Sequence, residues 1–205
     1  MSYLENAVLS MLPSEDKQRL LPLLRTVQMK LGDVLAETHA RVELAHFPYG
    51  GIISFVVELK SGVAMETGMV GRDGLFGASQ ALDDKLSLNK VVVQVAGTAA
   101  VVSSDKLHEL AANSRALTEL LVKHEQFFLA QVQQSVACNG AHAVEQRMCR
   151  WLLRMYDLVG LDLILTQEFL AQMIGVARSS VSSVAATLQK SGLISSVRVT
   201  ASNIA

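Results

Sequence analysis

Two short helical segments joined by a glycine constrain the fold of this chain more than any other stretch. Residues 165–194 read LTQEFLAQMIGVARSSVSSVAATLQKSGLI. Thr166, followed by Gln167 and an acid, predicts the capped start of one helix, and Gly175 predicts its end. A second helix is predicted to start at about Arg178. The pattern therefore predicts two short helices with a tight turn between them.

The small and branched residues in this stretch predict that the helices cross as a helix-turn-helix. Ala171 permits a close crossing, Gly175 permits a positive-φ turn, and Val181 is a core residue one turn into the second helix. The alternative is an ordinary helical hairpin, whose outer face normally carries glutamate and lysine. Here the outward positions carry one arginine, small hydroxyls and no acid: Arg178, Ser179, Ser180, Ser182, Ser183 and Thr187. Such a surface can enter a polyanionic groove, so we favour double-stranded DNA as its partner.

The charges of the chain support this partner. The net charge is −1, but residues 138–205 carry 6 Lys+Arg against 4 Asp+Glu, whereas residues 1–137 carry 12 against 15. The C-terminal third is thus mildly basic. This excess suffices for a module that makes a few phosphate contacts per protomer, and dimerisation would double it.

Upstream, the sequence has the texture of a β-rich domain. Residues 14–24 predict a short helix capped by Ser14 and limited by Pro22. Between about residues 27 and 103, short β-branched runs such as IISFVVEL at 52–59 are separated by Gly and Asp turn signals. Runs of this length predict an antiparallel barrel or sandwich that ends near Ser104.

A long helix is predicted after this domain, with one stripe at alternating spacings of four and three. The stripe either packs on the chain's own sheet or forms the seam of a two-fold dimer. We favour the dimer, because Leu120, Phe127 and Val132 provide a second apolar face for the sheet. The stripe consists of Leu117, Leu121, His124, Phe128, Gln131, Ser135 and Cys138.

The Asn139–Gly140 pair is expected to end this helix and form a hinge. A further helix is predicted from about His142 to Leu158, with a basic ridge of Arg147, Arg150 and Arg154 on one side. Such a ridge is usually a solvated face, and the alternative is a contact with the DNA backbone.

Several classes of protein are disfavoured by the composition. The longest apolar candidate for a membrane span, residues 126–144, is interrupted by polar residues, and the N-terminus lacks the pattern of a signal peptide. We therefore expect a cytoplasmic protein with no membrane partner. Cys138 and Cys149 are the two cysteines and form no CxxC pair, so neither a disulfide framework nor a zinc site is indicated.

Over almost its whole length the chain resembles the Crp/Fnr family of bacterial transcription regulators. Residues 165–194 are similar to the family's helix-turn-helix, and ACNGAHAVEQRMCRWLL at 137–153 to its hinge and following helix. HFPYGGIISFVVELKSG and METGMVGRDGLFGAS resemble the double-stranded β-helix, or jelly roll, that the family shares with cyclic-nucleotide-binding modules. The resemblance implies an α+β chain with a sensor domain at 1–115, a dimerisation helix at 116–138 and a (winged) helix-turn-helix domain at 139–205.

The resemblance also implies roles for individual residues and partners. Arg178 would be a base-reading arginine, Ser179 and Ser183 would occupy neighbouring reading positions, and Thr166 would be a phosphate-contacting cap. The implied partners are double-stranded DNA, a second copy of the chain and a small-molecule effector of unknown identity, with RNA polymerase considered as a further one. The predicted DNA-contacting set is Thr166, Gln167, Arg178, Ser179, Ser180, Ser182 and Ser183.

The sensor domain departs from the family where cyclic nucleotides bind. In those modules a Gly-Glu pair holds the ribose and an Arg-Ser or Arg-Thr pair holds the cyclic phosphate. The matching positions here are Gly77–Ala78 and Asn89–Lys90. Both the carboxylate that holds the ribose and the guanidinium that holds the cyclic phosphate are therefore missing. We predict no cofactor. Cyclic AMP is disfavoured by the missing groups, and an iron–sulfur cluster is disfavoured because both cysteines lie outside the sensor domain. A haem axial ligand stays open for the histidines His39, His46, His108 and His124.

The DNA-binding region departs from the family as well. Ser179 and Ser183 replace the usual Glu and Arg, which shifts recognition toward DNA shape, and Ala177 replaces a capping serine. The tail after Ile194 is too short for a complete two-stranded wing, although Arg198 could reach a phosphate. Two rival interpretations are a cupin-like metal enzyme, which its isolated histidines disfavour, and a signalling or scaffold protein that has lost DNA binding.

Overall fold

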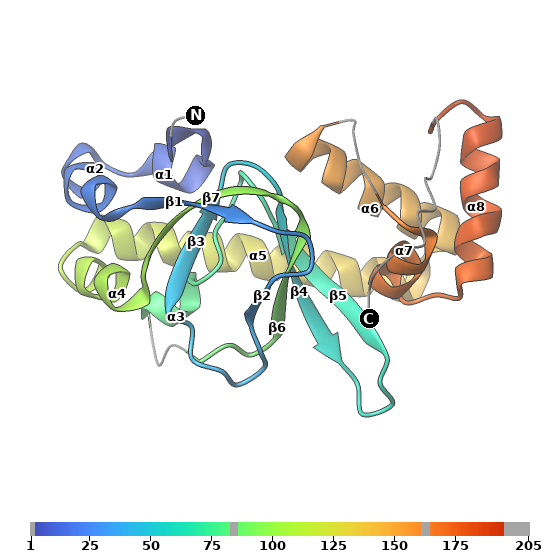
Figure 1. The fold of residues 1–205 in the computed structure, drawn as a ribbon, viewed down its shortest axis with the longest axis horizontal. Coiled ribbons are helices and arrows are strands. Elements are labelled where there is room, and N and C mark those ends of the chain that lie inside the picture. Colours follow the sequence, from blue (N-terminus) through green and yellow to red (C-terminus); the bar gives the residue numbers. More distant parts are fainter. Residues whose placement is uncertain (1–2, 83–85, 161–164, 195–205) are drawn as a thin grey trace.

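A computed structural model of the chain describes residues 3–82, 86–160 and 165–194. An N-terminal β-roll is flanked by short helices, and a long helix connects it to a C-terminal group of three helices (Figure 1). The elements of the N-terminal part are η1 (Tyr3–Glu5), α1 (Ala7–Met11), α2 (Ser14–Leu20), η2 (Leu21–Leu23), β1 (Arg25–Met29), β2 (Val34–Ala36), β3 (Leu44–Pro48), β4 (Ile52–Glu58), β5 (Ala64–Val70), α3 (Ala78–Leu82), β6 (Lys90–Val95), β7 (Gly97–Ser103) and α4 (Ser104–Ala112). The remaining elements are α5 (Arg115–Ala141), α6 (Val144–Val159), α7 (Gln167–Ile174) and α8 (Arg178–Lys190).

The strands form two antiparallel sheets that face each other, as the alternating β-branched runs predict. One sheet has the order β1-β7-β3 and the other β2-β6-β4-β5. β7 ends at Ser103, in agreement with the predicted end of the sheet domain. One local prediction is wrong: Ser14 is the first residue of α2 rather than its cap, and Pro13 holds the cap position.

Buried apolar side chains fill the inside of the roll. They come from both sheets and from the loops between them, and Phe55 and Phe128 pack against them at the edge. The fully enclosed set is Met29, Ala36, Val42, Ile53, Val70, Phe76, Val91, Val93 and Ala99. Sheet-on-sheet burial of this kind is the main term that stabilises the domain.

The long helix α5 continues past the predicted hinge. Asn139 and Gly140 are helical, and the helix ends at Ala141, where the His142 N–H still donates to the Cys138 carbonyl. One glycine costs a helix only about 1 kcal/mol, and Asn139 gains a hydrogen bond from Arg147 at 3.0 Å. The prediction that the helix breaks at this pair is therefore wrong, and the connection to α6 lies at residues 142–143.

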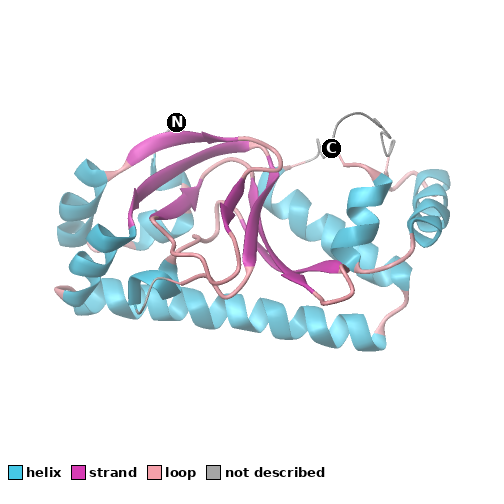
Figure 2. Cartoon of the chain, turned by 60° about the horizontal axis from the view of Figure 1, so that its bottom comes forward, coloured by secondary structure: helices cyan, strands magenta, loops and turns pink. Residues whose placement is uncertain are grey.

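The predicted dimer stripe of α5 faces the protomer's own β-roll. His124 Nε2 accepts from the Leu75 N–H at 3.1 Å, Gln131 Oε1 accepts from the Met69 N–H at 2.9 Å, and Phe128 packs on Phe55 at 4.4 Å between ring centres. Figure 2 shows the helix running under the strands along the length of the molecule. The prediction that this stripe is a dimer seam is thus wrong, and so is the assignment of Phe127 to the sheet, because Phe127 is exposed.

The opposite face of α5 is exposed and partly apolar. Val122, Leu129 and Val136 repeat every seven residues and are 40%, 54% and 67% exposed. Gln126 and Gln133 lie between them at spacings of four and three, and both are exposed. This set, the outer stripe of α5, has the a/d periodicity of a coiled-coil seam.

Candidate nucleic-acid interface

The first helix of the predicted helix-turn-helix is capped and closed as its sequence indicates. Thr166 Oγ1 accepts from the Phe169 N–H at 3.1 Å. Gly175 adopts φ +64°, and its N–H donates to Gln172 while the Val176 N–H donates to Ala171 at 2.9 Å. Because only glycine takes this conformation without strain, the chain turns sharply toward α8.

The second helix buries one face and presents the other to solvent. Val181, Ala185 and Leu188 pack with α6 and α7 in a shared core. At its N-terminus Ala177 supplies no side-chain hydrogen bond, as expected from the missing serine. α8 forms the edge of the molecule furthest from the N-terminal helices (Figure 1), which leaves its outer face accessible.

The outer face of α8 consists of Arg178, Ser179, Ser183 and Thr187, all of which are exposed. The Arg178 side chain is 53% exposed and forms an ion pair with Glu168 of α7, 3.0 Å apart. Exposed pairs of this kind contribute about 0–1 kcal/mol. The guanidinium can therefore exchange this carboxylate for a base edge at little cost. The sequence indicates Glu168 only as an acid in the first turn of α7, because its pairing with Arg178 depends on the tertiary turn between the two helices.

Two members of the predicted DNA-contacting set face each other instead of solvent. Ser182 Oγ lies 2.5 Å from Gln167 Oε1 and 3.1 Å from the Arg178 carbonyl, so its single proton is already engaged. Ser180 is half-buried. Residues 195–205, which include Arg198 and the predicted wing, lie outside the described residues.

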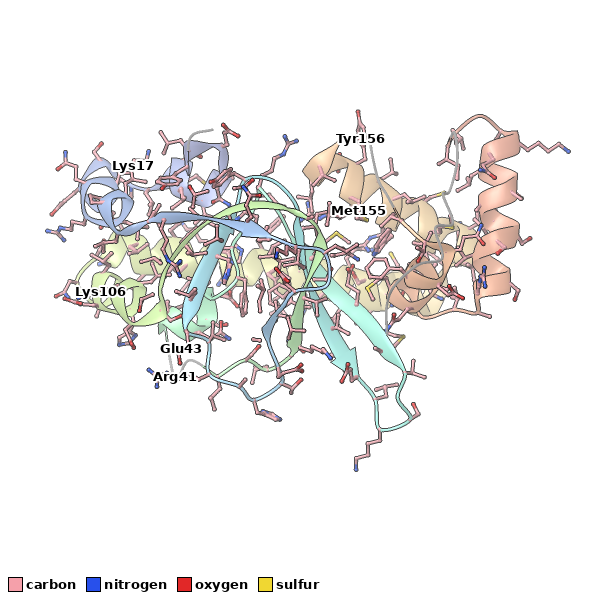
Figure 3. All side chains as sticks on the ribbon, viewed as in Figure 1. Lys17, Arg41, Glu43, Lys106, Met155 and Tyr156 are labelled. Carbon is pink, nitrogen blue, oxygen red and sulfur yellow. The ribbon has the colours of Figure 1, made fainter. Side chains whose placement is uncertain are left out.

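The arginine ridge of α6 does not form a solvated face. Arg147, Arg150 and Arg154 are half-buried against α5 and the β-roll. Arg150 Nη1 donates to Ser135 Oγ at 3.2 Å, and Arg154 pairs with Asp73 at 2.5 Å. Figure 3 shows the orientation of α6, with Met155 on the side of the sheet and Tyr156 pointing away. The expectation of a solvated face is therefore wrong, and these arginines bind partners within the protomer.

The residues of the β-roll at the positions of the family's nucleotide site make contacts within the protein. Gly77, at φ +104°, packs so closely on Ala45 that an added Cβ would lie 2.9 Å from its Cα. Lys90 Nζ is paired with Glu58 at 3.1 Å and Glu37 at 3.8 Å. The Phe128 ring of α5 packs directly on Gly68 of β5, where an added Cβ would lie 2.9 Å from the ring.

Three of the four histidines considered as haem ligands make structural hydrogen bonds. His46 Nδ1 lies 3.1 Å from the Leu44 carbonyl, and His108 Nδ1 lies 2.8 Å from the Ala81 carbonyl. His124 accepts from Leu75, and His39 is exposed. Within the described ranges, no three His, Cys, Asp or Glu side chains gather as metal ligands. Nor does any helix of those ranges have the length and apolarity to cross a membrane.

The chain thus combines two parts: a β-roll, and a helix-turn-helix domain that a long helix joins to it. Comparison with known proteins identifies the C-terminal part of the chain. Residues 146–204 match the model of the Crp-like helix-turn-helix domain. No curated protein sequence matches the chain.

Solved structures with the same fold include proteins described as regulators. The c-di-GMP responsive global regulator CLP of Xanthomonas campestris has a TM-score of 0.69 at 14% identity, over 88% of this chain and 94% of that one. FixK2 of Bradyrhizobium japonicum has a TM-score of 0.70 at 14% identity, over 82% and 86%. A CRP/FNR family regulator of Thermus thermophilus has a TM-score of 0.64 at 18% identity, over 82% and 87%. The chain thus has the fold of these structures and carries a Crp-like helix-turn-helix domain, which confirms the predicted α+β fold.

Proposed function

We propose that this protein is a DNA-binding transcription regulator that acts in the cytoplasm as a homodimer on a two-fold operator. The observation that carries the proposal is the exposed outer face of α8, where one guanidinium stands among small hydroxyls. Arg178 would read a base edge in the major groove, while Ser179, Ser183 and Thr187 would let the helix approach the phosphates. Thr166 at the start of α7 would contact the phosphate backbone.

The outer stripe of α5 supports the dimer. Val122, Leu129 and Val136 leave apolar area in water, and a second copy related by a two-fold axis would bury it. The intervening glutamines would fix the register of the two helices. Such a pairing would hold two copies of α8 one DNA turn, ~34 Å, apart.

Binding to DNA is tested with genomic fragments and the purified full chain. Fragments retained by the protein are amplified, and their affinity is measured by mobility shift across a range of salt concentrations. We expect retained fragments with a two-fold sequence pattern and a negative slope of log affinity against log salt. Retention of no fragment at any salt concentration would contradict the proposal and would favour a scaffold role.

A further inference from the structure

A small cavity of about 40 Å³ lies where the β-roll meets the helix-turn-helix domain. Four elements line it: β5 from the roll, the end of α5, the inner side of α6 and the end of α7. The lining is unusual because it concentrates arginines away from the DNA-facing surface. Its polar members include Glu66, Ser135, Asn139, Arg147, Arg150 and Arg154.

Two of these arginines have no acidic partner in the described part of the chain. Arg150 donates to the Ser135 hydroxyl, and Arg147 donates to the Asn139 side chain at 3.0 Å and to the Ile174 carbonyl. All of these acceptors are neutral. A guanidinium has five N–H donors, so each group keeps donors that a ligand can use.

The third arginine adds to this surplus of donors. Arg154 forms an ion pair with Asp73 through Nη2. Its Nε is buried and has no hydrogen-bond partner among the described residues. A buried donor without a partner is costly, and a ligand oxygen would remove that cost.

Glu66 is the one carboxylate among the residues that line the cavity, and Trp151 and Ser54 hold it by hydrogen bonds. Its Oε1 accepts from Trp151 Nε1 at 2.9 Å and its Oε2 accepts from Ser54 Oγ at 2.6 Å. Burial raises the pKa of this carboxyl to about 7, against the hydrogen bonds from Ser54 and Trp151 and the charge of Arg154. Near neutral pH the group can take up a proton, so the cavity keeps a positive balance.

We propose that this junction binds a small oxyanion, with Arg147 and Arg150 as its charged ligands. The donor geometry of guanidinium groups matches the oxygens of phosphate and carboxylate. The volume admits a few water-sized groups, since one water needs roughly 10–15 Å³. An inorganic oxyanion or a carboxylate of a few atoms therefore fits, and a nucleotide does not.

Because the cavity lies between the two domains, its ligand would regulate DNA binding, and this consequence rests on the proposed DNA-binding function. An anion that joins α6 and α7 to β5 and α5 stabilises this particular docking of the two domains. Its binding would shift the population of DNA-binding orientations. The site itself is independent of DNA and can be tested without it.

The chain contains one tryptophan, Trp151, and it lines the cavity, so its fluorescence reports on the site directly. The full chain is titrated with phosphate, nitrate or acetate at constant ionic strength, with chloride as the reference. We expect a saturable change for the oxyanions, and the phosphate and acetate arms distinguish an inorganic ligand from a carboxylate. Arg150→Gln should weaken binding at least about tenfold, which corresponds to ~1.4 kcal/mol. Arg115→Gln, at the exposed start of α5, should leave the affinity unchanged.

Absence of a saturable change with every oxyanion, or equal affinity in wild type and Arg150→Gln, would overturn the site. Should Arg150→Gln fail to fold by circular dichroism, Arg147→Gln is judged by the same criterion. Mobility shifts on the same samples separate the two proposals. A missing oxyanion response with intact DNA binding overturns only this site, whereas an intact response without DNA binding overturns only the proposed function.

Discussion

The indole Nε1 of Trp151 donates a hydrogen bond to Glu66 Oε1, 2.9 Å away, and so connects α6 to β5. Two further contacts span the same junction: Arg154 pairs with Asp73, and Arg72 donates to the Asp157 carbonyl at 2.7 Å. The apolar core of the helix-turn-helix also extends to Ile52 and Met69 of the roll. The two domains are therefore docked by polar and apolar contacts in this structure.

The Glu66 carboxyl should make the stability of this docking depend on pH. Its folded pKa, about 7, lies above the ordinary value of 4.5, so wild type loses stability as pH rises from about 4.5 to 7. Glu66→Gln keeps a donor and an acceptor but cannot ionise. We expect the free energy of unfolding of Glu66→Gln, relative to that of wild type, to increase by up to ~3 kcal/mol between pH 5 and pH 8. Denaturant unfolding at both pH values measures this difference. A relative stability that does not change with pH would contradict this role.

His46 should have the opposite pH dependence. Burial lowers its pKa from 6.5 to about 4, assisted by the charge of Arg25 and opposed by the bond to Leu44. Its neutral form is favoured in the folded state, so stability is lost as pH falls from 6.5 to 4. Since His46 stacks on Phe76, His46→Phe should keep the packing and lessen the loss of Tm over this range. An equal acid sensitivity in variant and wild type would exclude His46 as its source.

Gly175 should be less tolerant of alanine than Gly192. Both have positive φ, +64° and +72°, which costs an alanine about 1–2 kcal/mol. At Gly175 a Cβ would also collide with the Met65 side chain of β5, whereas nothing lies within 4 Å at Gly192. We expect a larger decrease in Tm for Gly175→Ala, and the difference should vanish in the Met65→Ala background. Equal effects of the two alanines would show that β5 does not restrict this turn.

The outer stripe of α5 should control the oligomeric state. Leu129→Glu places a charge at the centre of the stripe, and two copies would face each other across a two-fold seam. We expect a shift from dimer to monomer in sedimentation velocity. Lys123→Glu lies on the same helix outside the stripe and serves as the control. A dimer that survives Leu129→Glu would place the interface elsewhere, and a monomeric wild type would contradict the proposed dimer.

The helix-turn-helix was predictable from the sequence because its determinants are local. Thr166, Ala171, Gly175 and Val181 each fix a cap, a crossing or a turn within a few residues. The orientation of α5 was not predictable in the same way. Periodicity shows which residues share a face, but two stripes of the helix have coiled-coil spacing, and only the tertiary contacts of Phe128 with the roll decide which one turns inward.

The junction cavity illustrates the same limit. The spacing of the α6 arginines placed them on one side of the helix correctly, but their partners come from distant segments: Ser135, Asn139 and Asp73. The hinge prediction failed because an Asn-Gly pair only favours a turn statistically. The free-energy cost of keeping these two residues helical is small enough for a long helix such as α5 to continue through them.

The most direct test of the account is the affinity of Arg178→Ala for a DNA fragment selected by the wild-type chain. If Arg178 reads a base edge, this variant should lose about 1–3 kcal/mol of binding free energy, and specificity should relax at one position of each half-site. Arg115→Ala, at the other end of the molecule, should bind as wild type does. Unchanged affinity in Arg178→Ala would contradict the claim that the outer face of α8 enters the DNA groove.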